Sequence, residues 1–169
     1  MKKITFTLIV EDFGKDCNFS GKAWETNNHE YVILLNNPEN AETTLIHELI
    51  HILQYADEYD FISDIMQEIV TYAPETYHNV LDYVHENYGS PVDYREVEAK
   101  SIEVYISILC DNLMEEPIRY FDFLTNWLAV DYDLLLIPEE IFKSYDNYLD
   151  KDSNVSYTLD LNKIDNGDD

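Results

Sequence analysis

The sequence "TTLIHELIHILQYAD", residues Thr43–Asp57, is rich in apolar residues. Its apolar residues recur every three or four positions, which predicts an α-helix from about Ala41 to Tyr59. Apolar side chains stand on more than one side of this helix, so we expect the rest of the chain to bury it. The residues concerned are Leu45, Ile46, Leu49, Ile50, Ile52 and Leu53.

Two histidines interrupt this apolar helix. His47 and His51 are four residues apart, so their side chains project from one face toward a common point. Burying two unpaired imidazoles is costly, and a metal ion removes that cost because neutral imidazole is a good zinc ligand. The alternative is a structural helix in which the two histidines occur by chance. The burial and the spacing together favour a metal site.

Glu48 follows the first histidine directly. It is rotated by about 100° from His47 around the helix, which places its carboxylate beside the metal and not on it. Zinc lowers the pKa of a bound water to about 7, and a carboxylate within reach can accept the proton as the water attacks a carbonyl. The three positions therefore predict two zinc ligands, His47 and His51, and a general base, Glu48.

The pattern His-Glu-x-x-His, here "HELIH", resembles the motif of the zincin metallopeptidases. A catalytic zinc ion needs a third protein ligand. Asp57 stands where the metzincin branch has its last ligand, but Gln54 replaces the glycine that ends the helix in that branch. On a continuing helix Asp57 would lie about 120° from His51, out of reach of the metal. The metzincin pattern is therefore disfavoured.

The stretch "YREVEAKSIEVYISIL", residues Tyr94–Leu109, resembles the glutamate helix of the gluzincins. Several gluzincin branches have Glu-x-x-Ala, which implies that Glu96 is the third zinc ligand. Glu98 is the alternative, since helical periodicity alone does not choose between the two. Whichever glutamate is not the ligand is expected to be a solvated acidic residue in the first helical turn. The resemblance covers about residues 30–109.

Gluzincins often have an aspartate four residues after the glutamate ligand, which orients a zinc-bound histidine. Lys100 occupies that position here, so another group must do this. Gln54, on the same helix face as the histidines, is the candidate, with plain surface exposure as its alternative. Tyr94 is the best placed tyrosine to stabilise an oxyanion. By the same resemblance, the strand "EYVILLN" (Glu30–Asn36) would flank the cleft and pair with extended peptide.

The chain carries a large negative charge. It has 35 acidic and 10 basic residues, for a net charge of −25, which disfavours direct binding to nucleic acid and anionic membranes and attracts basic partners. The leading hypothesis is therefore a zinc-dependent metalloendopeptidase acting on a protein or peptide, and the charge favours a basic substrate. The alternative is an acidic protein-binding or DNA-mimic-like protein in which the zinc site is structural or vestigial. Solubility alone also accounts for the charge.

The remaining pattern predicts an α+β fold with a small N-terminal antiparallel or mixed sheet packed on a mainly helical, zincin-like body. We expect one domain over residues 1–150 and a loose acidic tail over 151–169, in which "VSYTLDL" could add a strand. Strands are predicted at 4–10, around 22–25 and at 30–36. Further helices are predicted at 61–73, 74–88, 91–113, 117–130 and 138–148, four of them with a proline at or near the start.

Cys17 and Cys110 match no zinc-ribbon or redox spacing and are expected to be free thiols. The lysines and apolar residues at the N-terminus lack the length and cleavage site of a secretion signal. No stretch is long and apolar enough to span a bilayer. A cytoplasmic location is therefore expected.

Overall fold

The computed structural model describes residues 2–13, 19–36, 41–56, 59–116 and 118–149, which form four strands and six helices. Predicted and observed class agree: the fold is α+β. In chain order the elements are β1 (Lys2–Glu11), β2 (Gly21–Glu25), β3 (Tyr31–Asn36), α1 (Ala41–Tyr55), α2 (Tyr59–Tyr72), α3 (Pro74–Tyr88), α4 (Tyr94–Leu113), α5 (Tyr120–Tyr132), β4 (Leu134–Phe142) and α6 (Tyr145–Leu149).

The strands form one mixed sheet in the order β2-β3-β1-β4. β1 is parallel to both β3 and β4, whereas β2 is antiparallel to β3. Alternate side chains of β1 enter two different clusters: Leu8 packs into the main core, and Ile9 packs with Val32 and Phe142 on the other side. The two inner strands, β1 and β3, thus contribute apolar side chains to clusters on both faces of the sheet.

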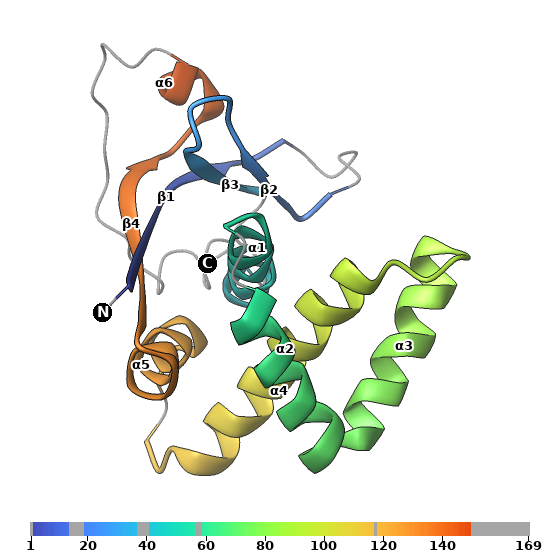
Figure 1. The fold of residues 1–169 in the computed structure, drawn as a ribbon. Helices are drawn as coiled ribbons and strands as arrows, with labels where there is room; N and C mark the ends of the chain where they lie inside the picture. The colour runs from blue at the N-terminus through green and yellow to red at the C-terminus, as the bar shows by residue number, and fades with distance from the viewer. Residues whose placement is uncertain (1, 14–18, 37–40, 57–58, 117, 150–169) are drawn as a thin grey trace.

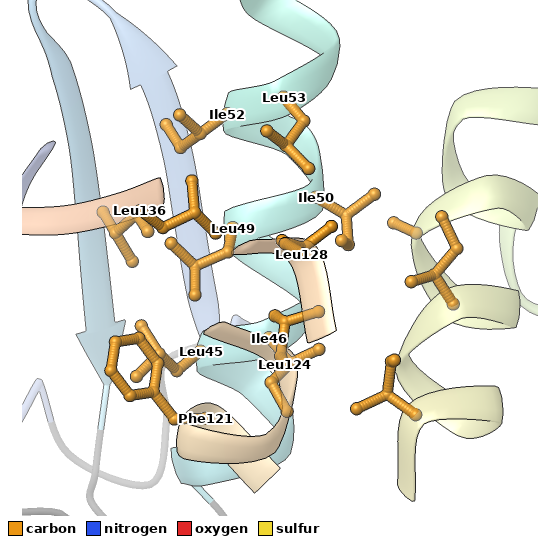
Figure 2. Close-up of a cluster of buried hydrophobic side chains, with 14 of the residues drawn as sticks. Leu45, Ile46, Leu49, Ile50, Ile52, Leu53, Phe121, Leu124, Leu128 and Leu136 are labelled. Carbon is orange, nitrogen blue, oxygen red and sulfur yellow. The ribbon is translucent and has the colours of Figure 1, made fainter. Parts of the chain in front are cut away.

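Helix α1 occupies the centre of the molecule. It packs against β2, β3, α2, α4 and α5, and not one of its 15 residues is exposed. The ribbon shows α1 between the sheet and the remaining helices (Figure 1). Figure 2 shows its leucine and isoleucine side chains pointing toward the strands on one side and toward a neighbouring helix on the other. The prediction of a buried helix is confirmed.

Helix α4 lies beside α1 and is held there from two sides. Ile102 and Ile106 enter the same core as α1, and Val97 packs with Val80 and Val84 of α3 in a smaller cluster. The side chain of Asp93 accepts a hydrogen bond from the backbone N–H of Arg95 and caps the first turn. This cap and the packing fix the start of α4 next to the middle of α1.

The predicted helix at residues 138–148 is wrong. Residues 134–142 form β4, and the helix that follows, α6, spans only Tyr145–Leu149. Proline is tolerated in a sheet at an edge strand or a bulge, and β4 has both features: it is an edge strand, and its pairing with β1 skips Glu139 between Pro138 and Glu140. The apolar run Leu134–Ile137 therefore continues through the proline as a strand.

The strand beside the cleft also differs from expectation. β3 lies between β2 and β1, so both of its edges are already paired; among the described strands, β2 forms the edge on that side of the sheet. The tail at 151–169 with its "VSYTLDL" segment, together with Cys17 and Asp57, lies outside the described residues. Cys110 is buried and has a free thiol. None of the described helices has the length and apolar character needed to cross a membrane.

Candidate metal centre

Helices α1 and α4 bring three potential ligands together. The Nε2 atom of His47 lies 3.0 Å from Oε2 of Glu96, and the Nε2 atom of His51 lies 3.1 Å from Oε1 of the same carboxylate. The three groups offer ligand atoms within 4.8 Å of one another, and all three side chains are partly buried. Within the described part of the chain, this is the group of His, Cys, Asp and Glu residues that could hold a metal ion.

The second ring nitrogen of His51 is held by Gln54. Its Nδ1 lies 2.6 Å from Oε1 of Gln54, while the amide nitrogen of Gln54 donates to the backbone oxygen of Arg95 and to Oε1 of Glu98. Because the amide nitrogen is committed to these two acceptors, the histidine Nδ1–H must be the donor to Oε1. The sequence-based suggestion that Gln54 orients a histidine agrees with this contact.

This arrangement fits a metal ion. With its proton on Nδ1, His51 presents a lone pair on Nε2 to the carboxylate of Glu96, which also has only lone pairs to offer. Two acceptors face each other at this distance favourably only when a proton or a cation lies between them. The donor set of two imidazole nitrogens and one carboxylate is one that zinc accepts.

His47 is oriented by a residue that the sequence analysis missed. Its Nδ1 atom lies 3.4 Å from Oε1 of Glu103, and Nζ of Lys100 lies 2.8 Å from the other oxygen of that carboxylate. Glu103 follows Glu96 by seven residues, about two helical turns, so both carboxylates lie on the same side of α4. This seven-residue spacing is the sequence signal from which the position of Glu103 could have been predicted. Glu103 thus orients the histidine in place of the aspartate expected at position 100, and Lys100 holds the Glu103 carboxylate through their ion pair.

The charges in the centre depend strongly on one another. Burial alone would lower the pKa of His47, but hydrogen bonds to the carboxylates of Glu103 and Glu96 raise it to about 9. The pKa of His51 is also raised, because Glu96 and Gln54 outweigh the effect of burial. Burial would raise the pKa of Glu96, but the two histidines hold it well below its usual range. The site therefore favours an ionised Glu96 together with positive charge at the histidine nitrogens.

Glu48 is more deeply buried than the ligands beside it, with only 7% of its surface exposed. Burial raises its pKa, and the nearby carboxylates of Glu96 and Glu103 add to this effect against the opposing charges of the histidines. Strand β2 covers it closely: a Cβ atom at Gly21 would lie 3.1 Å from Cγ of Glu48 and 2.7 Å from Cγ2 of Thr44. Only glycine allows this approach.

Two cavities of about 470 and 540 Å³ meet at the centre. They share Gly21, Lys22, Glu48 and Glu96 in their walls. The first extends between β2 and the helices α3 and α4, and the second extends along β2 toward the start of α4. Glu48 and the ligands are therefore accessible from both sides along β2.

The structure places Tyr94 away from these cavities. It is 65% exposed and lines neither of them. Tyr83 and Tyr88, at the end of α3, line the first cavity instead. Burial and the charge of Glu96 raise the pKa of Tyr88 to about 12. Its position could not be read from the sequence, since α3 meets the centre only through tertiary packing.

The side chain of Gln54 lies between His51 and Glu98, the alternative third ligand. Its carboxylate accepts a hydrogen bond from Gln54 at 2.8 Å, and burial raises its pKa. The structure thus groups Glu96 with the two histidines and places Glu98 behind Gln54.

Comparisons with protein-family models, with curated proteins and with solved structures find no match to this chain. The resemblance to the gluzincins therefore depends on the residues themselves. The described centre is a His-His-Glu cluster suited to a metal ion, with a buried carboxylate next to it and a cavity on each side.

Proposed function

We propose that this protein is a zinc-dependent peptidase in which His47, His51 and Glu96 hold the metal and Glu48 is the general base. One observation supports this above the others: both histidine Nε2 atoms converge on the Glu96 carboxylate, with Glu48 lining the cavities beside them. Three protein ligands leave one position open for water or substrate, as in catalytic zinc sites.

Bound at this centre, zinc would lower the pKa of a water molecule and polarise the carbonyl group of the substrate. Glu48, which lines the cavities beside the ligands, would hold the proton released by that water. Its raised pKa suits this role, because a carboxylate with a higher pKa is a stronger base near neutral pH. Gln54 and Glu103 keep the imidazole rings in position through their Nδ1 atoms.

Two further groups support a peptide substrate. The hydroxyl of Tyr88 remains protonated at neutral pH, because its pKa is about 12, and can donate a hydrogen bond to the developing oxyanion. β2, the edge strand among the described strands, lines both cavities. An extended peptide can add to such an edge through backbone hydrogen bonds, which places its carbonyl groups along the cavities.

The proposal is tested by Glu48→Gln. We expect wild type and variant to bind one zinc ion per chain, measured by elemental analysis, because glutamine preserves the shape of the site. Peptide cleavage should fall by about 100-fold to 10,000-fold in the variant, the typical contribution of general acid–base catalysis. Glu75→Gln, a substitution in the first turn of α3, removes the same charge outside both cavities and should leave cleavage unchanged.

An acidic interaction protein with a structural metal site predicts the opposite pattern. In that case zinc would bind, wild type would cleave no peptide, and Glu48→Gln would preserve partner binding. That result would contradict the peptidase proposal.

A further inference from the structure

Basic residues are concentrated around the candidate metal centre of this acidic protein. Lys22 and Lys100 line the first cavity, and Lys22 and Arg95 line the second. Three of the chain's 10 basic residues thus border the two cavities. Of two cavities remote from the centre, one is lined by Arg119 and by five carboxylates, Glu42, Asp111, Glu115, Glu116 and Asp122, and the other by Lys2, Lys3, Glu30 and Glu139.

Lys100 is held firmly in the wall of the first cavity. Its Nζ atom lies 2.8 Å from Glu103 and 5.2 Å from the ring centre of Tyr83, and 30% of its side chain is exposed. The ion pair and the ring contact both restrict its rotamers. The ammonium group is therefore already positioned before a substrate binds, which reduces the entropy lost on binding.

Lys22 approaches the same cavity from β2. Its side chain is exposed and its Nζ atom lies 4.4 Å from the ring centre of Phe19. Among the described residues, no carboxylate forms an ion pair with Lys22. Lys22 therefore contributes a positive charge to the cavity wall that remains available to a ligand.

The carboxylates of this cavity already have other partners. Glu96 contacts both histidines, and Glu103 contacts His47 and Lys100. Glu48, the proposed base, is buried under β2. Lys22 is therefore the positively charged group of this wall that has no ion-pair partner among the described residues, although the net charge of the protein is −25.

We infer that the cavity lined by Lys22 and Lys100 binds a carboxylate of the substrate next to the bond that is cleaved. This inference rests on the proposed peptidase function and defines its substrate class. The carboxylate is an acidic side chain or the C-terminus of a peptide. The expectation of a basic substrate came from the net charge, but charges farther away than about 8 Å are largely screened at physiological ionic strength, so the lysines dominate inside the cavity.

The test uses matched peptides with zinc-loaded protein. A positional peptide library first locates the cleaved bond and the positions that influence it. At each position near that bond, peptides with Glu, Gln or Lys are then compared, all acetylated and amidated. A fourth peptide has a free C-terminus and no acidic side chain, which distinguishes a terminal carboxylate from a side chain. We expect at least one carboxylate-bearing peptide to have a kcat/KM about tenfold above that of its neutral counterpart.

Binding is measured separately by calorimetry with Glu48→Gln, so that affinity does not depend on turnover. The preference for the carboxylate should fall toward unity when Lys22→Gln or Lys100→Gln is added to this variant. Lys3→Gln is the matched control, since Lys3 is an exposed lysine of β1 that lines neither cavity at the centre, and it should preserve the preference. Zinc content is measured in each variant, because Lys100 also contacts Glu103.

Each outcome decides between the hypotheses. A carboxylate preference that is lost in both lysine variants supports the inference. Cleavage without a preference, a preference for the Lys peptides, or a preference that survives both lysine substitutions overturns the inference and leaves the peptidase proposal intact. If zinc-loaded wild type cleaves no peptide and Glu48→Gln binds none, the peptidase proposal itself fails, and the inference fails with it.

Discussion

Each histidine of the candidate centre has one nitrogen directed at Glu96 and the other held by a different partner. His51 donates to an amide oxygen of Gln54 on its own helix, whereas His47 faces the carboxylate of Glu103 on α4. A carboxylate partner makes an imidazole a stronger electron donor than an amide partner does. The two ligands are therefore expected to differ in how strongly they depend on their supporting residues.

Glu103→Gln tests this difference. The substitution preserves the shape of the side chain and removes its charge, so His47 loses its carboxylate partner and Lys100 loses its ion pair. Zinc affinity should weaken by about 10-fold to 100-fold, the usual effect of removing a group that orients a metal ligand. Competition with a chromophoric chelator measures this affinity. Glu115→Gln, an exposed residue just beyond α4, is the control, and equal affinities in both variants would contradict the proposed role of Glu103.

The sequence analysis singled out His47, His51 and Glu96, and the structure brings these three side chains together. His47 and His51 share a face because they are one helical turn apart, and the Glu-x-x-Ala frame singled out Glu96. Glu103 and Tyr88 were missed because their positions depend on how α4 and α3 pack against α1. No spacing within one helix specifies which side of a second helix it meets.

At the scale of elements, the closest fit in the site is between β2 and α1. A Cβ atom at residue 21 would lie 2.7 Å from Cγ2 of Thr44, 3.1 Å from Cγ of Glu48 and 3.2 Å from the backbone oxygen of Leu34. Threonine is stiff about its Cα–Cβ bond, so the strand would have to move away from the helix.

Gly21→Ala should therefore separate Glu48, the proposed base, from its covering strand. We expect the free energy of unfolding to fall by about 1–3 kcal/mol, the usual cost of overpacking, and kcat to fall while zinc still binds. Chemical denaturation measures the free energy of unfolding, a peptide cleavage assay measures kcat, and elemental analysis measures bound zinc. Adding Thr44→Ser removes the nearest methyl group and should restore part of the stability. An unchanged stability in Gly21→Ala would show that the approach of β2 tolerates a methyl group.

Most elements were predicted from periodicity, and α3 was predicted with its observed bounds. The exception, β4, shows the limit of local signals. A proline after a short apolar run reads as a helix start, yet pairing with β1 along the sheet edge outweighs that preference. Such pairing joins residues more than 130 positions apart in the chain, and a local pattern contains no information about it.

At the scale of the whole molecule, the candidate metal centre and the core share one helix. α1 supplies both histidines and is also the helix that the sheet and the other helices surround. Loss of the metal would leave His47, His51 and Glu96 facing one another in a partly buried site with no cation between them. Their interaction is then sustained only by bound protons, which couples the site to the stability of the entire fold.

Zinc removal should therefore lower the melting temperature of the whole protein in one cooperative step. At a free zinc concentration about 1,000 times the dissociation constant, the stabilisation is about 4 kcal/mol, which corresponds to a rise in Tm of roughly 8–16 °C for a chain of this size. Calorimetry with zinc and with a chelator measures the difference. His51→Ala should melt at the same temperature with zinc and with the chelator, because one of the three proposed zinc ligands is removed. His78→Ala, a substitution on α3, should retain the full zinc-dependent rise in Tm. A zinc-dependent shift that persists in His51→Ala would place the stabilising metal outside the His-His-Glu cluster.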